Sequence, residues 1–316
     1  MTAMVAKPVT PGALDGRAGV VMTALCLIWA LQQISLKAAA EQISPMLVVA
    51  LRSLVAMLLL AALMWHRGES PDRRHWKAGS IVGTLFALEY LLVVEALRMT
   101  HASHVVVFLY TAPLFAALGL HARLPAERLG LIQWTGISLA FGGIVVAFLG
   151  GASDASDAVR GQSLLGDALA LLAGLAWGAT TVAIRCSALS SAPATETLLY
   201  QLLGAFVLLL PSAWLTGQWR FEPTVTVWAH LGFQSLIVSF ASFLAWFWLL
   251  RRYLASRLGV FSFLTPLFGV LLGVWLLGES LEPAFVLGSG LVLAGIGLVS
   301  GHAAVSLRLR RLRADD

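Results

Sequence analysis

Two carboxylic acids, Glu89 and Glu95, lie within one long apolar stretch of the sequence. A carboxylate at membrane depth requires a partner, a proton or a water-filled cavity. Glu89 is predicted to lie deep, next to Tyr90, where it could bind an ammonium group or carry a proton. Glu95 precedes Arg98 by about one helical turn, so a local ion pair near the surface explains it more simply. The two acids face different directions on a helix, which argues against a paired-carboxylate site.

Tryptophans and amides occur near the centre of the first apolar stretch, as Trp29, Gln32 and Gln33. Their counterparts in the second half of the chain are Trp177 and, among the polar residues, Thr181. Tryptophan is more usual at the membrane interface than at mid-depth, so a matched pair favours side chains that line a cavity. The alternative is that the tryptophans only pack between helices and that the amides bond across them.

A polar stripe follows one face of a later apolar stretch. Ser235, Ser239, Ser242 and Trp246 succeed one another at steps of four, three and four, a spacing that puts them on the same side of a helix. We expect Ser239, Ser242 and Trp246 to line a path for a small molecule. Small residues also favour tight helix packing in lipid, which is the alternative explanation.

Two prolines, Pro113 and Pro266, interrupt apolar stretches at equivalent places in the two halves. Proline removes a backbone hydrogen bond and can kink a helix, so both are candidate gating bends. Tyr110 lies three residues before Pro113 and is predicted to face the same cavity.

The chain lacks the patterns of catalytic and metal sites. His101 and His104 could ligate a metal together with a third group, but no cysteine or second histidine cluster completes such a site. Cys26 and Cys186 fit packing roles. We find no GxSxG, HExxH or P-loop motif, which disfavours an intramembrane enzyme and ATP-driven transport within this chain. We therefore expect no catalytic residue, no cofactor and no metal.

Other charged and small residues have simpler explanations. Arg52 stands inside an apolar stretch, where it either snorkels to an interface or pairs with an acid on a neighbouring helix, and we expect a structural role. Lys37 and Arg185 lie near the ends of stretches and are expected to snorkel to the headgroups. The GxxxG pattern at Gly269 and Gly273 predicts a helix contact surface, within the chain or between protomers.

The composition is that of a bilayer protein, with 59% hydrophobic residues and only 12% charged, about half the charged fraction of a soluble domain. The net charge of +5 does not indicate nucleic acid, because the basic residues stand in short segments beside apolar runs. The first run, from Val20 to about Ala39, exceeds the roughly 7 to 15 residues of a signal-peptide core. It is therefore predicted to be a retained helix.

Windows of about 20 apolar residues, enough to cross the bilayer, can be placed ten times. The predicted spans are 20–39, 46–65, 78–97, 103–120, 131–149, 164–184, 194–215, 227–250, 258–277 and 285–301. With both termini inside, the outside segments keep only Lys37, Arg98, Arg160 and Arg220, and nearly all of the other basic residues fall inside. Positive loops stay cytoplasmic, so this orientation is strongly favoured.

The two halves of the chain repeat each other. Trp29 aligns with Trp177 and Lys37 with Arg185 at one constant offset, and Pro113 aligns with Pro266 at nearly the same one. Each copy holds five spans, an odd number, so the second copy must enter the membrane in the opposite sense. Inverted repeats of this kind are common in secondary transporters, which bind substrate near the midplane between the halves.

Paired ASxxxxFxxxxPLF segments at 102–115 and 255–268, the GES sequence at 278–280 and the glycine-rich fifth and tenth spans carry a resemblance to a known family. The chain resembles the EamA-type members of the drug/metabolite transporter superfamily over essentially its full length. The resemblance implies a ten-helix exporter of the cytoplasmic membrane, with a central cavity lined by helices 1, 3, 4, 6, 8 and 9. The aromatic amino acid exporter branch is a plausible relative.

These observations predict an all-α polytopic membrane protein with ten transmembrane helices, arranged as two inverted five-helix repeats around a central cavity. The expected parts are a cytoplasmic tail at 1–17, repeats at 18–150 and 164–301, an extracytoplasmic linker at 151–163 and a basic cytoplasmic tail at 302–316. We expect an alternating-access exporter of small metabolites, with amino acids, aromatic ones included, as the leading substrates and protons as a candidate coupling ion. Export of cationic drugs or of other metabolites is the alternative. Both a monomer and a homodimer are compatible with the sequence.

Overall fold

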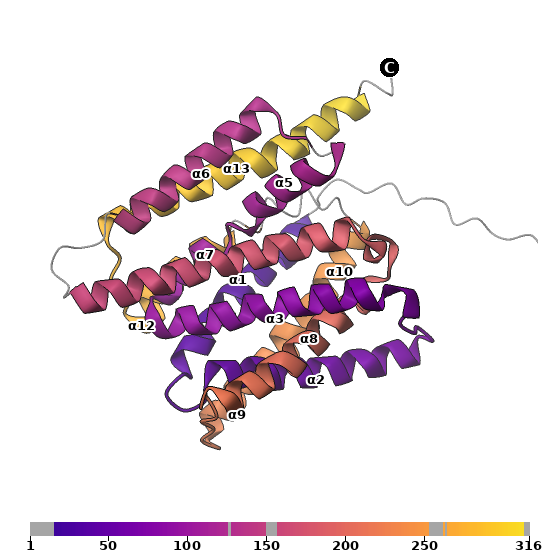
Figure 1. Ribbon diagram of the computed structural model, residues 1–316, viewed down its shortest axis with the longest axis vertical. Helices are drawn as coiled ribbons and strands as arrows, with labels where there is room; N and C mark the ends of the chain where they lie inside the picture. Colours follow the sequence, from indigo (N-terminus) through magenta and orange to yellow (C-terminus); the bar gives the residue numbers. More distant parts are fainter. Residues whose placement is uncertain (1–15, 126–127, 150–156, 253–261, 263, 313–316) are drawn as a thin grey trace, which may run out of the picture.

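The computed structural model describes residues 16–125, 128–149, 157–252, 262 and 264–312 (Figure 1). These residues form helices joined by short connections, and the single β-bridge among them joins Ile43 to Phe221. The proposed tails at 1–17 and 302–316 and the linker at 151–163 fall largely outside the described residues or their described side chains. An all-helical protein is therefore confirmed for the described part of the chain.

The first half of the chain contributes six α-helices. They are α1 (Gly16–Ala38), α2 (Pro45–His66), α3 (Trp76–Met99), α4 (Ala102–Leu109), α5 (Ala112–Arg123) and α6 (Leu131–Leu149), with a 3-10 turn, η1 (Arg73–His75), before α3. Each helix coincides with a predicted apolar span or with part of one, because long apolar runs without charge can satisfy their backbone in lipid only as helices.

The second half follows the same order. It contains α7 (Asp157–Arg185), the short η3 (Ala188–Ser191), α8 (Ala194–Leu215), α9 (Val225–Gly232), the π-helix η4 (Phe233–Ser242), α10 (Phe243–Arg252), α12 (Leu264–Leu277) and α13 (Pro283–Leu312). Seven helical segments of the described chain are long and apolar enough to cross a membrane, and three shorter apolar helices lie at Leu131–Ala147, Leu264–Leu277 and Pro283–Leu298. The predicted span 258–277 begins in residues that the structure does not describe.

Two of the predicted spans are not continuous α-helices. The fourth is divided into α4 and α5, and Pro113 stands in the first turn of α5, where its missing N–H costs nothing. The Thr111 hydroxyl donates to the carbonyl of Phe108 at 2.6 Å, next to the break between the two helices. The eighth predicted span contains the π-helical turns of η4, which the sequence did not reveal. Such π-helical insertions are rare and occur frequently at functional sites.

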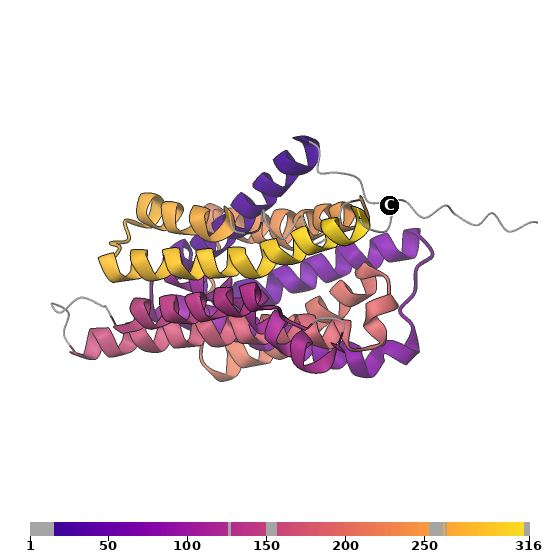
Figure 2. The ribbon, with the colours of Figure 1, turned by 90° about the horizontal axis from the view of Figure 1, so that it is seen from above.

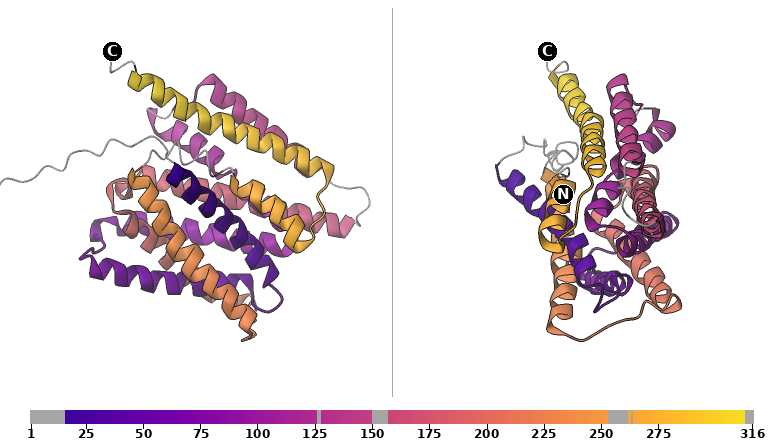
Figure 3. Two further views of the ribbon diagram at one scale, coloured as in Figure 1. Left: turned by 180° about the vertical axis from the view of Figure 1, so that it is seen from behind. Right: turned by 90° about the vertical axis from the view of Figure 1, so that its left-hand side faces the viewer.

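The helices pack in extended pairs. The yellow α13 lies along α6 in both Figure 1 and Figure 3, while α3 runs between α7 on one side and α2 and α8 on the other. Seen from above, α12 and α13 form a layer on one side of α6 and α7 (Figure 2). The central residues of the described chain, from α1, α3, α4 and η4, are therefore enclosed by helices of both halves.

Glycines allow the closest of these contacts. A Cβ atom on Gly83 would lie 2.5 Å from the carbonyl oxygen of Tyr200 on α8, and Gly204 meets the backbone of Gly83 in turn. Gly143 and Gly288 bring α6 and α13 together in the same way. The predicted contact surface at Gly269 and Gly273 is used inside this chain, because Gly269 faces Val106 of α4 and Gly273 faces the side chains of Glu279 and Ser103.

Candidate functional site

A buried polar network joins the middle of α1, α3 and η4. The Gln32 side-chain amide donates to the hydroxyl of Tyr90 at 3.1 Å, and the amide of Gln234 donates to the backbone carbonyl of Gln32 at 2.9 Å. All three side chains are buried, with Gln234 at 0% exposure. The predicted residues Gln32 and Tyr90, from different helices, are thus brought into direct contact.

Arg52 of α2 is the cation of this network. Its guanidinium Nη1 donates to the side-chain oxygen of Gln234 at 2.5 Å, and its Cζ lies 4.5 Å from the centre of the Tyr90 ring. Only 2% of the residue is exposed. The cation–π contact and the amide bond compensate part of the cost of burying a charge. Arg52 therefore points into the protein and does not snorkel to an interface.

Glu89 of α3 is a buried carboxyl group close to Arg52. The residue is 5% exposed, its Oε2 atom has no hydrogen-bond partner among the described residues, and the charge of Arg52 acts on it electrostatically. Neither residue takes part in an ion pair of the described chain. A guanidinium and a carboxyl group thus lie near each other in the interior without forming an ion pair.

Aromatic side chains of α1 and α10 lie beside the polar stripe of η4. The indole N–H of Trp29 donates to the hydroxyl of Ser242 at 3.0 Å, and the Trp29 and Trp246 rings meet edge to face at 5.8 Å. Ser235, Ser239 and Ser242 are buried on the same helix. The structure therefore joins Trp29, Ser242 and Trp246, three of the predicted residues, into one contact group.

The second tryptophan of the repeat contacts a different aromatic residue. Trp177 of α7 meets the ring of Tyr110 edge to face at 5.2 Å, and Tyr110 lies where α4 ends before Pro113. Thr181 is half-buried and donates to the carbonyl of Trp177 at 3.3 Å, as a helical threonine ordinarily does.

The remaining predicted residues lie nearby or at helix starts. Gln33 is buried, and its side-chain oxygen has no partner within the described part of the chain. Pro266 is in the first turn of α12, next to the buried Thr265. Residues 253–261, which precede α12, are not described. Gating by Pro113 and Pro266 therefore stays a prediction.

A second network, which the sequence did not suggest, closes one end of the bundle. The His104 ring contacts both oxygens of Asp167 at 3.0 Å, Thr100 donates to the same carboxylate at 2.6 Å, and the His104 ring stacks on Phe285 at 3.7 Å. Helices α3, α4, α7 and α13 meet here. Asp167 could have been noticed as an acid within an apolar stretch.

Glu279, of the GES sequence, binds the start of α4 at the same end. Its two carboxylate oxygens accept from the backbone N–H groups of Ala102 at 2.5 Å and Ser103 at 3.0 Å. Gly278 adopts a positive φ of 66°, which glycine tolerates at no steric cost. The Lys37 ammonium group donates to the carbonyl of Leu97, in the last turn of α3, and to that of Thr100, which follows the helix. Lys37 therefore caps the end of α3 and does not snorkel to the lipid headgroups as predicted.

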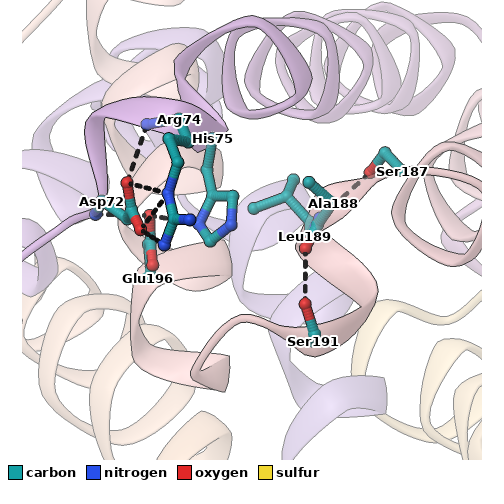
Figure 4. A network of polar contacts seen from close by, with 8 residues as sticks. All are labelled: Asp72, Arg74, His75, Ser187, Ala188, Leu189, Ser191 and Glu196. Carbon is teal, nitrogen blue, oxygen red and sulfur yellow. Dashed lines mark hydrogen bonds and ion pairs between the residues drawn. The ribbon is translucent and has the colours of Figure 1, made fainter.

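The opposite end of the bundle is tied by the loop between α2 and α3. The carboxylate of Glu196, in the first turn of α8, contacts the ring of His75 at 3.0 Å and accepts from the backbone N–H of Asp72 at 3.0 Å (Figure 4). Asp72 is also held by the guanidinium of Arg74, and these hydrogen bonds lower the pKa of Asp72 to about 2. At the other end, the predicted Glu95–Arg98 ion pair is confirmed at 2.9 Å.

Residues 17–149 and 164–301 each match the EamA-like transporter family. The chain belongs to this family. It is similar to the uncharacterized transporter YoaV of Bacillus subtilis, with 24% identity over 277 residues, which cover 85% of this chain and 92% of YoaV. It is also similar to the uncharacterized inner membrane transporter YedA of Escherichia coli strain K12, with 24% identity over 286 residues and 88% of each chain covered.

A crystal structure shares the fold. It superposes with a TM-score of 0.61 at 22% identity and covers 95% of this chain and 99% of its own. The EamA-family resemblance expected from the sequence is confirmed by the two family matches, and the chain is a polytopic member of a transporter family.

Within this EamA-family chain, the structure brings several of the predicted residues into two groups. One surrounds Gln32, Tyr90 and Glu89, and the other surrounds Trp29 and Ser242. Trp177 contacts Tyr110, and Thr181 bonds to the backbone of Trp177. Sequence reasoning missed Gln234 entirely and assigned Arg52 a structural role. A glutamine next to a serine stripe and an arginine inside an apolar stretch were the available signals.

Proposed function

We propose that this EamA-family protein is a secondary exporter of small metabolites that works by alternating access, with amino acids, aromatic ones included, as the leading substrates. It would lie in the cytoplasmic membrane with both termini in the cytoplasm, as the distribution of basic residues favours. The single observation that carries the proposal is the buried polar and aromatic site, which draws residues from both halves of a transporter-family chain.

The pattern of helix contacts supports ten spans in two inverted repeats, 18–150 and 164–301. Two contacts join equivalent helices of the two halves: α6 with α13, and α2 with α8. Another contact comes as an exchanged pair, because α1 packs on α12 as α7 packs on α5. A twofold axis in the membrane plane would generate such a pattern, and rocking of the halves about it would expose one site alternately.

The side chains at the centre suit a small molecule with both an apolar body and charged groups. Trp29 and Trp246 offer aromatic surface, whereas Gln33, Ser235 and Glu89 offer buried polar atoms without partners in the described chain. Most ligand sites combine an apolar lining with a few such polar groups. Cationic drugs are less well matched, since the buried Arg52 would repel them.

Counterflow into proteoliposomes tests the proposal. Purified protein should exchange at least one amino acid from a panel of amino acids, cationic drugs and nucleosides. Trp29→Phe, which removes the hydrogen bond to Ser242, should slow this exchange several-fold. The matched control is Trp65→Phe, because Trp65 is 87% exposed at the end of α2 and should leave the rate unchanged. Absence of any uptake, together with hydrolysis of lipid or peptide, would favour an intramembrane enzyme.

Coupling to protons rests on Glu89 alone. Glu89→Gln should abolish the response of flux to a pH gradient if this carboxyl carries the proton. Unchanged flux and an unchanged gradient response in this variant would exclude Glu89 as the coupling group.

A further inference from the structure

We infer that Arg52 binds the carboxylate of the substrate, opposite Glu89, so that the site selects a net-neutral zwitterion over the corresponding amine or acid. This inference rests on the proposed transport function and names the chemistry by which the site recognises its cargo.

The first observation is the incomplete hydrogen bonding of the Arg52 guanidinium. Its Nη1 atom is bound by Gln234, but its Nε atom is buried without a partner in the described chain. A guanidinium presents its donors in a planar fork that matches a carboxylate in a bidentate manner. Tyr90 covers one face of the guanidinium, which fixes the plane in which the fork points. The open Nε edge is therefore preorganised for an anion.

The second observation is a pair of buried acceptors that lack hydrogen-bond partners. Oε2 of Glu89 and the side-chain oxygen of Gln33 are both buried and unpaired in the described residues. An ammonium group carries three donors and no acceptor, so it complements such atoms. Buried polar atoms without partners are uncommon, and their occurrence on Arg52, Glu89 and Gln33 indicates a site built for a ligand.

The third observation is the charge balance. One buried guanidinium, that of Arg52, lies near one buried carboxyl group, that of Glu89, yet no ion pair of the described chain joins them. A ligand with only an ammonium group would leave the charge of Arg52 uncompensated at low dielectric, which is costly. A ligand with only a carboxylate would leave the buried Oε2 atom of Glu89 without a hydrogen-bond donor. A zwitterion supplies a partner for both residues at once, so the site favours zwitterions.

The geometry also separates the roles of the two halves. Arg52 and Glu89 both come from the first half of the chain, on α2 and α3, while Gln234, which orients Arg52, comes from the second half on η4. Relative movement of the halves would change the hydrogen bond from Arg52 to Gln234. The affinity of Arg52 for the substrate carboxylate would change with it.

Counterflow with a matched set of three compounds tests the inference: the best amino acid substrate of the wild-type protein, the amine that lacks its carboxylate and the acid that lacks its amino group. The wild-type protein should prefer the amino acid roughly tenfold or more over either analogue, because a site built around polar groups rejects ligands that leave those groups unpaired. Arg52→Gln should lose amino acid exchange and retain or gain exchange of the amine.

Gln234→Glu provides a second variant that does not remove the arginine. It places a carboxylate on Arg52 from within the protein, so amino acid exchange should fall roughly tenfold while the amine remains a substrate. Arg52→Lys should restore part of the preference, since it keeps the charge. Arg98→Gln is the matched control, because Arg98 is half-exposed in a surface ion pair and should leave the preference unchanged.

The outcomes separate the inference from the proposed function. Lack of exchange of any compound by the wild-type protein overturns the proposed function and the inference with it. Amino acid exchange without discrimination against the amine overturns the inference alone. The inference alone is also overturned if Gln234→Glu keeps the wild-type preference. It is likewise overturned if Arg52→Gln reduces the exchange of all three compounds equally and Arg52→Lys restores the exchange of none of them.

Discussion

Replacement of Glu279 by glutamine should destabilise the protein, although Glu279 lies away from the proposed substrate site. The carboxylate accepts from the N–H groups of Ala102 and Ser103, two of the groups that an α-helix cannot satisfy by itself at its start. Glu279 is 8% exposed, so water does not replace a lost bond easily. Glutamine keeps one acceptor oxygen but turns an amide N–H₂ toward the second backbone donor.

The magnitude follows from the two lost contributions. A hydrogen bond to a charged group is worth about 1.5–3 kcal/mol, and a negative charge at a helix N-terminus adds about 0.3–1 kcal/mol or more when buried. Glu279→Gln removes one such bond and the charge, so we expect a loss of about 2–4 kcal/mol. For a chain of this size each kcal/mol lowers the midpoint of thermal unfolding by about 2 °C. The midpoint should therefore fall by about 4–8 °C.

Thermal unfolding in detergent, followed by tryptophan fluorescence, measures this shift. Glu282→Gln is the matched control, because Glu282 stands three residues later and its side chain makes no hydrogen bond or ion pair within the described chain. Its midpoint should change by about 1 °C or less, as for most surface substitutions. Equal midpoints for Glu279→Gln and Glu282→Gln would refute the assignment of Glu279 as the cap of α4.

Two further predictions concern the helix contacts and the loop at the other end. Gly204→Ala should lower the unfolding midpoint, because the added methyl meets the backbone of Gly83 and overpacking costs about 1–3 kcal/mol. Gly290→Ala is the control, because nothing lies within 4 Å of the added methyl, and it should leave the unfolding midpoint unchanged. Equal midpoints for the two variants would contradict the contact between Gly204 and Gly83. The pKa of Asp72 is depressed to about 2, mainly by the side-chain hydrogen bonds from Arg74. The contribution of Asp72 to stability is therefore complete above about pH 4 and is lost as the pH falls toward 2. The ¹³C chemical shift of the Asp72 carboxyl group, followed against pH, measures this pKa. Titration of Asp72 at the ordinary aspartate pKa would contradict the prediction.

Much of the fold was predictable because its signals are local. Apolar runs of membrane-spanning length can satisfy their backbone in lipid only as helices. The break at Pro113 follows from one missing N–H, and the Glu95–Arg98 ion pair follows from spacing on one turn. The internal repeat was visible because equivalent positions in two folded halves retain similar residues.

The candidate site was predictable only in part, because it depends on where helices cross. Trp29 and Ser242 could be proposed separately, but they are far apart in the chain, and only packing of α1 against η4 and α10 joins them. The π-helical turns of η4 left no sequence pattern that we identified, yet they accompany the complete burial of Gln234.

The sequence by itself therefore determined the class of protein, its helices, its duplication and the identity of its intramembrane polar residues, since each depends on composition, length or neighbours along the chain. The tertiary structure alone decided which of these residues meet. It placed Arg52 beside Tyr90 and Gln234 rather than at an interface, held Glu89 apart from it, and used Asp167 and Glu279 to close one end of the bundle. The reason is physical: the cost of burying a charge depends on every partner around it, and those partners come from helices far away in the sequence.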